Sequence, residues 1–159
     1  MPEGRTKAIG EGYINRKLAA GVSLVKDNLV VEIDGSGELI LGTNTGTPYG
    51  IAARSSQNKL ARVAGISQFD AAVSVPLIRS GIVDLPLGST NVAIAIGDRI
   101  VVHADDDGTV DGAGAEDTTS AATLLNDQKL TVGFAEEVKA MDAGGTVRVA
   151  LKLYKGDAP

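Results

Sequence analysis

The sequence predicts an all-β protein: a compact β-barrel or sandwich with an extended N-terminal arm and a long acidic loop insert. Three observations support this fold class. The 159 residues include 20 glycines and many valines, isoleucines and threonines, whereas apolar residues at helical spacing are rare. Short apolar runs alternate with turn residues along the chain. One segment near the C-terminus alternates strictly in polarity, and the chain length suits a single domain.

The clearest predicted strand pair lies between residues 130 and 154. Its second strand has the period of two that is typical of a half-buried strand. Residues 142–145, with the sequence DAGG, supply turn chemistry before that strand, because glycine adopts positive φ without steric cost. One face of the strand carries Val147, Val149, Leu151 and Leu153, and the other carries Arg148, Ala150, Lys152 and Tyr154.

A looser version of this strand pair occurs earlier in the chain. Residues 48–52 (PYGIA) parallel residues 131–135 (TVGFA). Residues 73–81 (VSVPLIRSG) parallel the strand that begins at Val147. The chain is therefore predicted to contain two variations on one β-motif.

Residues 1–21 are predicted to form the arm, and residues 22–159 the β-body. The arm has four basic and two acidic residues, a net charge of +2, and glycines interrupt any helical pattern. It is either a frayed terminus or a segment that orders on a partner. For the second case the candidate contact residues are Tyr13, Ile14, Arg16, Lys17 and Leu18.

The predicted elements between the arm and the C-terminal pair are short strands. Residues 57–69 are ambiguous between a strand and an irregular turn. Pro76 cannot donate to a β-ladder, so the strand that contains it is predicted to lie at an edge or beside a bulge. Turns are expected at 34–37 and at Gly97, and a polar loop at 42–47. Strands are expected at 22–25, 29–33, 38–41, 71–79 and 82–85, and apolar segments at 92–96 and 99–102.

Residues 105–129 form the acidic insert, with seven carboxylates and one lysine. Most of it is expected to be exposed loop, with one or two helical turns within residues 119–126. Asp105, Asp107 and Asp111 superficially resemble a calcium loop, but their spacing does not match the EF-hand, and Asp-Gly is also a common hairpin turn.

Reactive groups are sparse. His103 is the only histidine and there is no cysteine, so a zinc site or a catalytic triad lacks partners. Glu136 and Glu137 are neighbours on a predicted strand and point to opposite faces. We predict no catalytic residues, no metal and no cofactor, although an enzyme that uses only carboxylates stays compatible with the residues.

Charge and composition also restrict the partners. The net charge of −5 and the five aromatic residues argue against nucleic-acid binding, which requires a basic surface or stacking platforms. The apolar runs are too short to cross a bilayer, and residues 1–13 lack the apolar core of a signal peptide. We therefore expect no nucleic-acid partner and no membrane.

The chain resembles the small capsid decoration, or cement, proteins of tailed viruses. The resemblance covers roughly the last two-thirds of the chain. It rests on strand and turn motifs rather than on reactive groups. These motifs are residues 73–81 (VSVPLIRSG), 82–86 (IVDLP), 96–102 (IGDRIVV), 132–135 (VGFA) and 145–151 (GTVRVAL).

The resemblance implies a β-barrel-like domain that forms a homotrimer on the outer capsid surface of the virion. Such a protein bridges neighbouring copies of the major capsid protein and stabilises the lattice. Under this interpretation the arm contacts the shell and the acidic insert faces solvent. Two rival functions remain: another virion structural subunit, such as a tail-tube or neck protein, and a carboxylate-based hydrolase of surface polymers.

Overall fold

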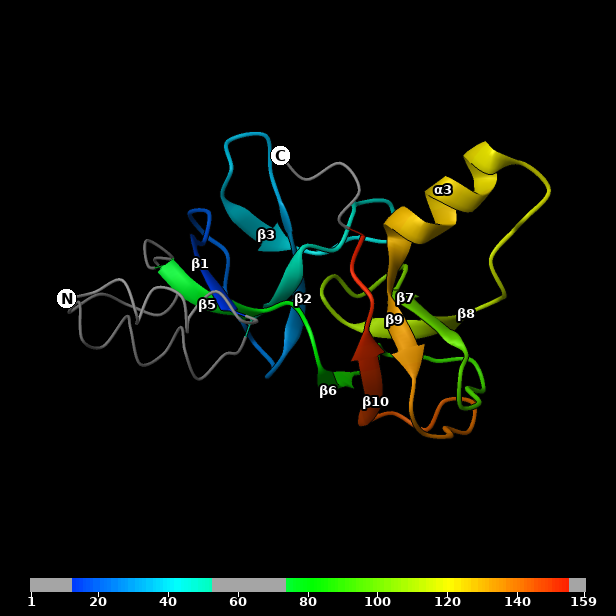
Figure 1. The fold of residues 1–159 in the computed structure, drawn as a ribbon. Coiled ribbons are helices and arrows are strands. Elements are labelled where there is room, and N and C mark those ends of the chain that lie inside the picture. Colours follow the sequence, from blue (N-terminus) through cyan, green and yellow to red (C-terminus); the bar gives the residue numbers. More distant parts are fainter. Residues whose placement is uncertain (1–12, 53–73, 155–159) are drawn as a thin grey trace.

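A computed structural model describes residues 13–52 and 74–154, with side chains described from Arg16 onward, and shows two antiparallel five-stranded sheets and one helix (Figure 1). The first sheet contains β1 (Tyr13–Lys17), β2 (Leu29–Ile33), β3 (Leu39–Leu41), β4 (Gly50–Ala52) and β5 (Ser74–Ile78). The second sheet contains β6 (Ile82–Pro86), β7 (Arg99–Val102), β8 (Val110–Ala113), β9 (Thr131–Ala135) and β10 (Thr146–Leu151), with α3 (Ala121–Leu130) between β8 and β9. The predicted all-β fold class is confirmed.

The two sheets have the same topology. The strand order is β1-β5-β4-β2-β3 in the first sheet and β6-β10-β9-β7-β8 in the second. Adding five to each strand number of the first sheet gives the strand order of the second sheet. The predicted repetition of one β-motif is therefore present in the fold, and it extends to all five strands.

Equivalent contacts bring the edge strands of each sheet together. In the first sheet, Leu18 after β1 forms a parallel bridge with Leu39, and the amide of Ala19 donates to the Leu39 carbonyl at 2.9 Å. In the second sheet, Leu87 forms the same bridge with Val110, and the amide of the next residue donates to the Val110 carbonyl at 3.1 Å. Each sheet is thus nearly closed, which limits its exposed edges.

The structure corrects the register of the predicted repeat. Ser74 pairs with Lys17, which precedes the bridge residue of the first sheet, and Thr146 pairs with Pro86, which precedes that of the second. Ser74 therefore corresponds to Thr146. The sequence comparison instead aligned Ser74 with the position two residues after Thr146. A two-residue slip keeps every apolar residue on the same face, so the alternating pattern alone cannot detect it.

The interior consists of two apolar clusters, and β2 contributes to both. Leu29 and Val31 pack inside the first sheet, whereas Val30 packs into the cluster of the second sheet because its side chain points to the opposite face. Ile51 also joins the second cluster. The first sheet is therefore buried on both faces where it meets the second.

The C-terminal strand has the predicted faces: Val147 and Val149 are buried, and Arg148 is exposed. The backbone of β10 packs so closely on β9 that a Cβ on Gly133 would lie 2.2 Å from the carbonyl oxygen of Ala150. No side chain fits in that space. Gly133 is therefore required by packing in the middle of the sheet.

Several predicted elements differ in the structure. Residues 22–25, predicted as a strand, are irregular. The apolar segment 92–96 forms a single bridge, from Ile94 to Lys139, and Asp111 and Asp98 accept hydrogen bonds from its backbone. The strand with Pro76 is internal in the strand order, but among the described residues it pairs with β4 only through Ile51 and Ile78. The acidic insert contains β8 and the ten-residue helix α3, so it is less irregular than expected. The ambiguous segment 57–69 lies outside the described residues.

The predicted boundary between arm and body is also corrected. Residues 13–17 form β1 and pair along their whole length with β5. Pairing with a neighbouring strand fixes this short segment as a strand, although glycines flank it in the sequence. The body therefore begins at Tyr13 and not near Val22, while residues 1–12 lie outside the described residues.

Candidate interaction surface

An exposed apolar surface lies at one end of the second sheet. Two irregular segments, residues 92–96 before β7 and residues 138–141 after β9, lie side by side (Figure 1, green and orange). Ile94 and Lys139 exchange two backbone hydrogen bonds, of 2.8 and 2.9 Å. We call these two segments the apolar ribbon.

The ribbon concentrates the exposed apolar side chains of the molecule. Ile94 points inward and is buried. The described part of the chain has seven large hydrophobic residues with exposed side chains, and four of them lie in the ribbon. These are Val92, Ile96, Val138 and Met141, with exposed fractions of 47%, 66%, 68% and 68%. These side chains lie on two segments that a backbone bridge holds together, and exposed apolar residues gathered in this way mark interaction sites more often than scattered ones do.

A buried asparagine fixes the shape of the ribbon. The side-chain amide of Asn91 donates to the carbonyls of Val92, at 2.7 Å, and Ala140, at 2.9 Å. Its carbonyl oxygen accepts from the amide of Gly144 at 3.2 Å. Asp111 accepts from the amide of Val92 at 2.9 Å. Hydrogen bonds therefore fix the backbone of both ribbon segments, and the surface of the ribbon is ordered before any partner binds.

Sequence reasoning interpreted residues 92–96 as an apolar segment before a turn and did not predict this surface. The available signal was a run of five consecutive apolar residues without the polar alternation of the other strands.

The five predicted contact residues have different environments. Tyr13 and Ile14 belong to β1, where their backbones pair with Ile78 and Leu77. Lys17 is exposed and forms an ion pair with Glu38 at 3.3 Å.

Leu18 does not suit the predicted contact role. It has no exposed surface, because it packs in the core of the first sheet. It therefore stabilises the fold and does not anchor a partner. Arg16 is half-buried and lies over the ring of Tyr49, with its Cζ 5.2 Å from the ring centre.

His103 has a structural role. It is buried, and its Nδ1 accepts from the amides of Asp105, at 3.0 Å, and Asp106, at 3.2 Å. Because Nδ1 accepts, the neutral ring carries its proton on Nε2, which donates to the hydroxyl of Thr90 at 3.2 Å. Both ring nitrogens are thus engaged. The described residues include no group of three histidine, cysteine or acidic side chains placed to hold a metal ion.

Acidic side chains of the insert accept hydrogen bonds from backbone amides. Asp106 accepts from the amide of Ser89, and this hydrogen bond lowers the pKa of the carboxyl group. Asp117 accepts from the amide of Thr119 at 2.9 Å, which lowers the pKa of Asp117 in the same way. These aspartates stabilise loops.

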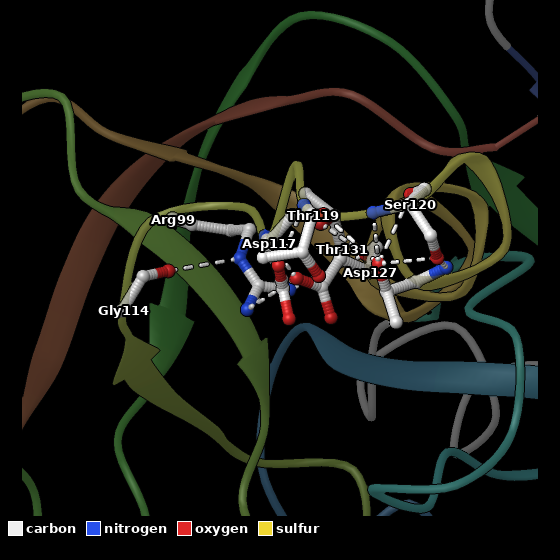
Figure 2. A network of polar contacts seen from close by, with 8 residues as sticks. Arg99, Gly114, Asp117, Thr119, Ser120, Asp127 and Thr131 are labelled. Carbon is white, nitrogen blue, oxygen red and sulfur yellow. Dashed lines mark hydrogen bonds and ion pairs between the residues drawn. The ribbon is translucent and has the colours of Figure 1, made fainter.

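A polar network attaches α3 to the second sheet (Figure 2). Arg99 of β7 donates to the carbonyl of Gly114 at 3.0 Å and forms an ion pair with Asp127 of the helix at 3.8 Å. Asp127 also accepts from the amide of Asp117 at 2.7 Å, and its carbonyl accepts from the hydroxyl of Thr131, also at 2.7 Å. No residue of α3 is buried, so polar contacts rather than apolar packing position it.

A cavity of about 270 Å³ lies between the end of the insert, β9 and the segment after β10. One carboxylate, Glu116, faces it, and a carboxylate-based hydrolase would need two that converge. The hydroxyl of Thr131 is engaged with Asp127. Among the described residues, the lining of this cavity therefore does not supply the pair of carboxylates that the hydrolase interpretation requires. Its lining residues are Glu116, Gln128, Thr131, Phe134, Lys152, Leu153 and Tyr154.

Comparison with known protein families finds no family that the sequence matches, and comparison with curated proteins finds no relative. The described helix, α3, is too short and too polar to cross a membrane.

Proposed function

We propose that this protein is a capsid decoration, or cement, protein of a tailed virus. In this proposal it binds the outer surface of the viral head as a homotrimer and stabilises the lattice of the major capsid protein. The observation that carries the proposal is the apolar ribbon, an exposed apolar surface with a hydrogen-bonded backbone at one end of a nearly closed sheet.

The ribbon has the properties of a protein-binding surface. Its exposed side chains carry no charge, as in the centre of protein interfaces, where charged residues are depleted. Lys139 is the ribbon's one charged residue, and it pairs with Glu137 at 3.8 Å. Because Asn91 already fixes the backbone, binding loses little conformational entropy at this site.

The rest of the described molecule suits a structural role. The lone histidine, the arginine that holds α3 and the aspartates of the insert are engaged in contacts that stabilise the fold. A small rigid adhesive surface gives modest affinity by itself. A trimer that engages several lattice positions together would bind far more tightly, because each further contact is intramolecular.

The experiment that tests the proposal is co-sedimentation with empty shells assembled from the major capsid protein of the same genome. The proposal predicts saturable binding, with a solution mass of three chains by light scattering. Absence of binding to intact shells would refute it. Rings or growing polymers in the light-scattering experiment would instead favour a tail-tube or neck subunit.

The test of the arm needs a shorter deletion than residues 2–21, because part of this segment belongs to the fold. Deleting residues 2–21 would remove β1 and the buried Leu18, so loss of binding would only report unfolding. Deleting residues 2–12 removes none of the residues that the structure describes. If the arm contacts the shell, this shorter deletion weakens binding while the melting temperature stays unchanged. Unchanged binding would refute the role of the arm and leave the ribbon as the contact.

A further inference from the structure

Two arginines share one aromatic ring in the first sheet. Arg16 lies in β1 and Arg79 directly follows β5, and both guanidinium groups lie over the ring of Tyr49. The distances from Cζ to the ring centre are 5.2 Å for Arg16 and 4.2 Å for Arg79. Two positive charges therefore share one aromatic ring in a chain whose net charge is −5.

These arginines differ from the other arginines that the structure describes. Arg99 pairs with Asp127 at 3.8 Å, and Arg148 pairs with Asp84 at 3.3 Å. Within residues 13–52 and 74–154, neither Arg16 nor Arg79 has a carboxylate partner. Positive charge that the described residues leave uncompensated attracts a nearby anion, and half-burial reduces the screening of that attraction by water. The pair is therefore a site at which an added negative charge is stabilised.

Contacts with Tyr49 orient both guanidinium groups. Arg79 Nε donates to the backbone carbonyl of Tyr49 at 2.8 Å, and Arg16 Nη2 donates to the Tyr49 hydroxyl at 3.3 Å. Arg16 Nε is enclosed and, in the described part of the chain, has no hydrogen-bond partner, so packing holds this group without an internal acceptor. In the described part of the chain, the two terminal nitrogens of Arg79 and the Nη1 atom of Arg16 also have no hydrogen-bond acceptor.

From this arrangement we infer that Arg16, Tyr49 and Arg79 form a carboxylate-binding site. The planar fork of a guanidinium matches the two oxygens of a carboxylate, and such charge-assisted hydrogen bonds are among the strongest in proteins. Because this protein has a net charge of −5, it repels a multiply charged anion more strongly than a single carboxylate. A single carboxylate is therefore the better ligand.

The inferred natural ligand is an acidic side chain of the protein to which this chain binds. This identity rests on the proposed function, in which the partner is the major capsid protein. The site is a second anchor, separate from the apolar ribbon, because it belongs to the first sheet and the ribbon belongs to the second.

The test uses the full chain and free anions, so it needs no shells. Acetate or inorganic phosphate is added at constant ionic strength while NMR follows the ring signals of Tyr49. We expect a saturable shift with acetate. Arg16→Gln and Arg79→Gln should each weaken acetate binding about tenfold or more. Arg148→Gln, which removes an exposed arginine that already has a partner, is the matched control and should leave the titration unchanged.

The outcomes separate this inference from the proposed function. No saturable shift with acetate, a shift with phosphate only, or an equal response of all variants would overturn the carboxylate site, whatever the result with shells. Arg79→Lys adds a check, since it retains the charge and loses the planar fork. It should also weaken acetate binding, whereas unchanged binding would show that charge alone suffices. Acetate binding without shell binding would retain the site and refute the proposed partner.

Discussion

Two aspartates in the apolar ribbon should strongly weaken shell binding without unfolding the protein. The variant is Ile96→Asp combined with Val138→Asp. About two-thirds of each side chain is exposed in the free molecule and available to a partner. Complete burial of such a side chain contributes about 1.5–3 kcal/mol, so the exposed part contributes about 1–2 kcal/mol on binding. Together the two side chains account for about 3 kcal/mol, or a ~150-fold weaker Kd.

This value is a lower bound, because the variant also brings two carboxylates into a contact that excludes water. The free energy of unfolding should change by no more than about 0.5 kcal/mol, because both positions are at the surface. Shell binding is measured by co-sedimentation over a range of concentrations, and stability by urea denaturation.

Ile82→Asp is the matched control. Ile82 is of the same residue type as Ile96 and has a similar exposed fraction, 61%, but it lies in β6 outside the ribbon. The control should bind shells like the unmodified protein. If the ribbon variant binds normally, or if the control loses binding equally, the ribbon is not the contact surface.

Three further predictions concern the fold. Gly133→Ala should destabilise the protein by about 1–3 kcal/mol or more, because its Cβ would meet the carbonyl of Ala150, whereas Gly35→Ala has open space and should be close to neutral in urea denaturation. Leu18→Ala should cost about 2–5 kcal/mol in the same assay if this residue belongs to the core, and a neutral result would restore it as a contact residue. Because folding lowers the pKa of Asp106 from 3.8, this carboxylate stabilises the fold fully above pH 3.8, and the stabilisation is lost as the pH falls through the lower pKa of the folded state. Asp106→Asn should remove this part of the pH dependence of stability. Identical melting curves of the variant and the unmodified protein from pH 2.5 to 6 would contradict the prediction.

The sequence predicts the strands whose polarity alternates and whose ends carry turn residues. The C-terminal strand is one example, and the strand after the 42–47 loop, although short, was found through its likeness to residues 131–135. The shared five-strand order of the two sheets could be anticipated only in outline. Its register could not, because a period-two pattern is unchanged by a two-residue slip.

The candidate sites depend on contacts between residues that are distant in the sequence. Asn91 reaches Ala140 across 49 positions, and Arg79 reaches Tyr49 across 30. Neither pairing follows from local propensity. β1 was missed for a related reason, since it lies within a segment, residues 1–21, whose sequence is interrupted by glycines, and its strand is stabilised by pairing with β5.

The most direct test of the proposed function is image reconstruction of capsid shells mixed with the protein. The account predicts additional density on the outer surface of the shell, with threefold arrangement and with residues 92–96 and 138–141 facing the shell. Shells without added density, or density in which the apolar ribbon faces solvent, would contradict it.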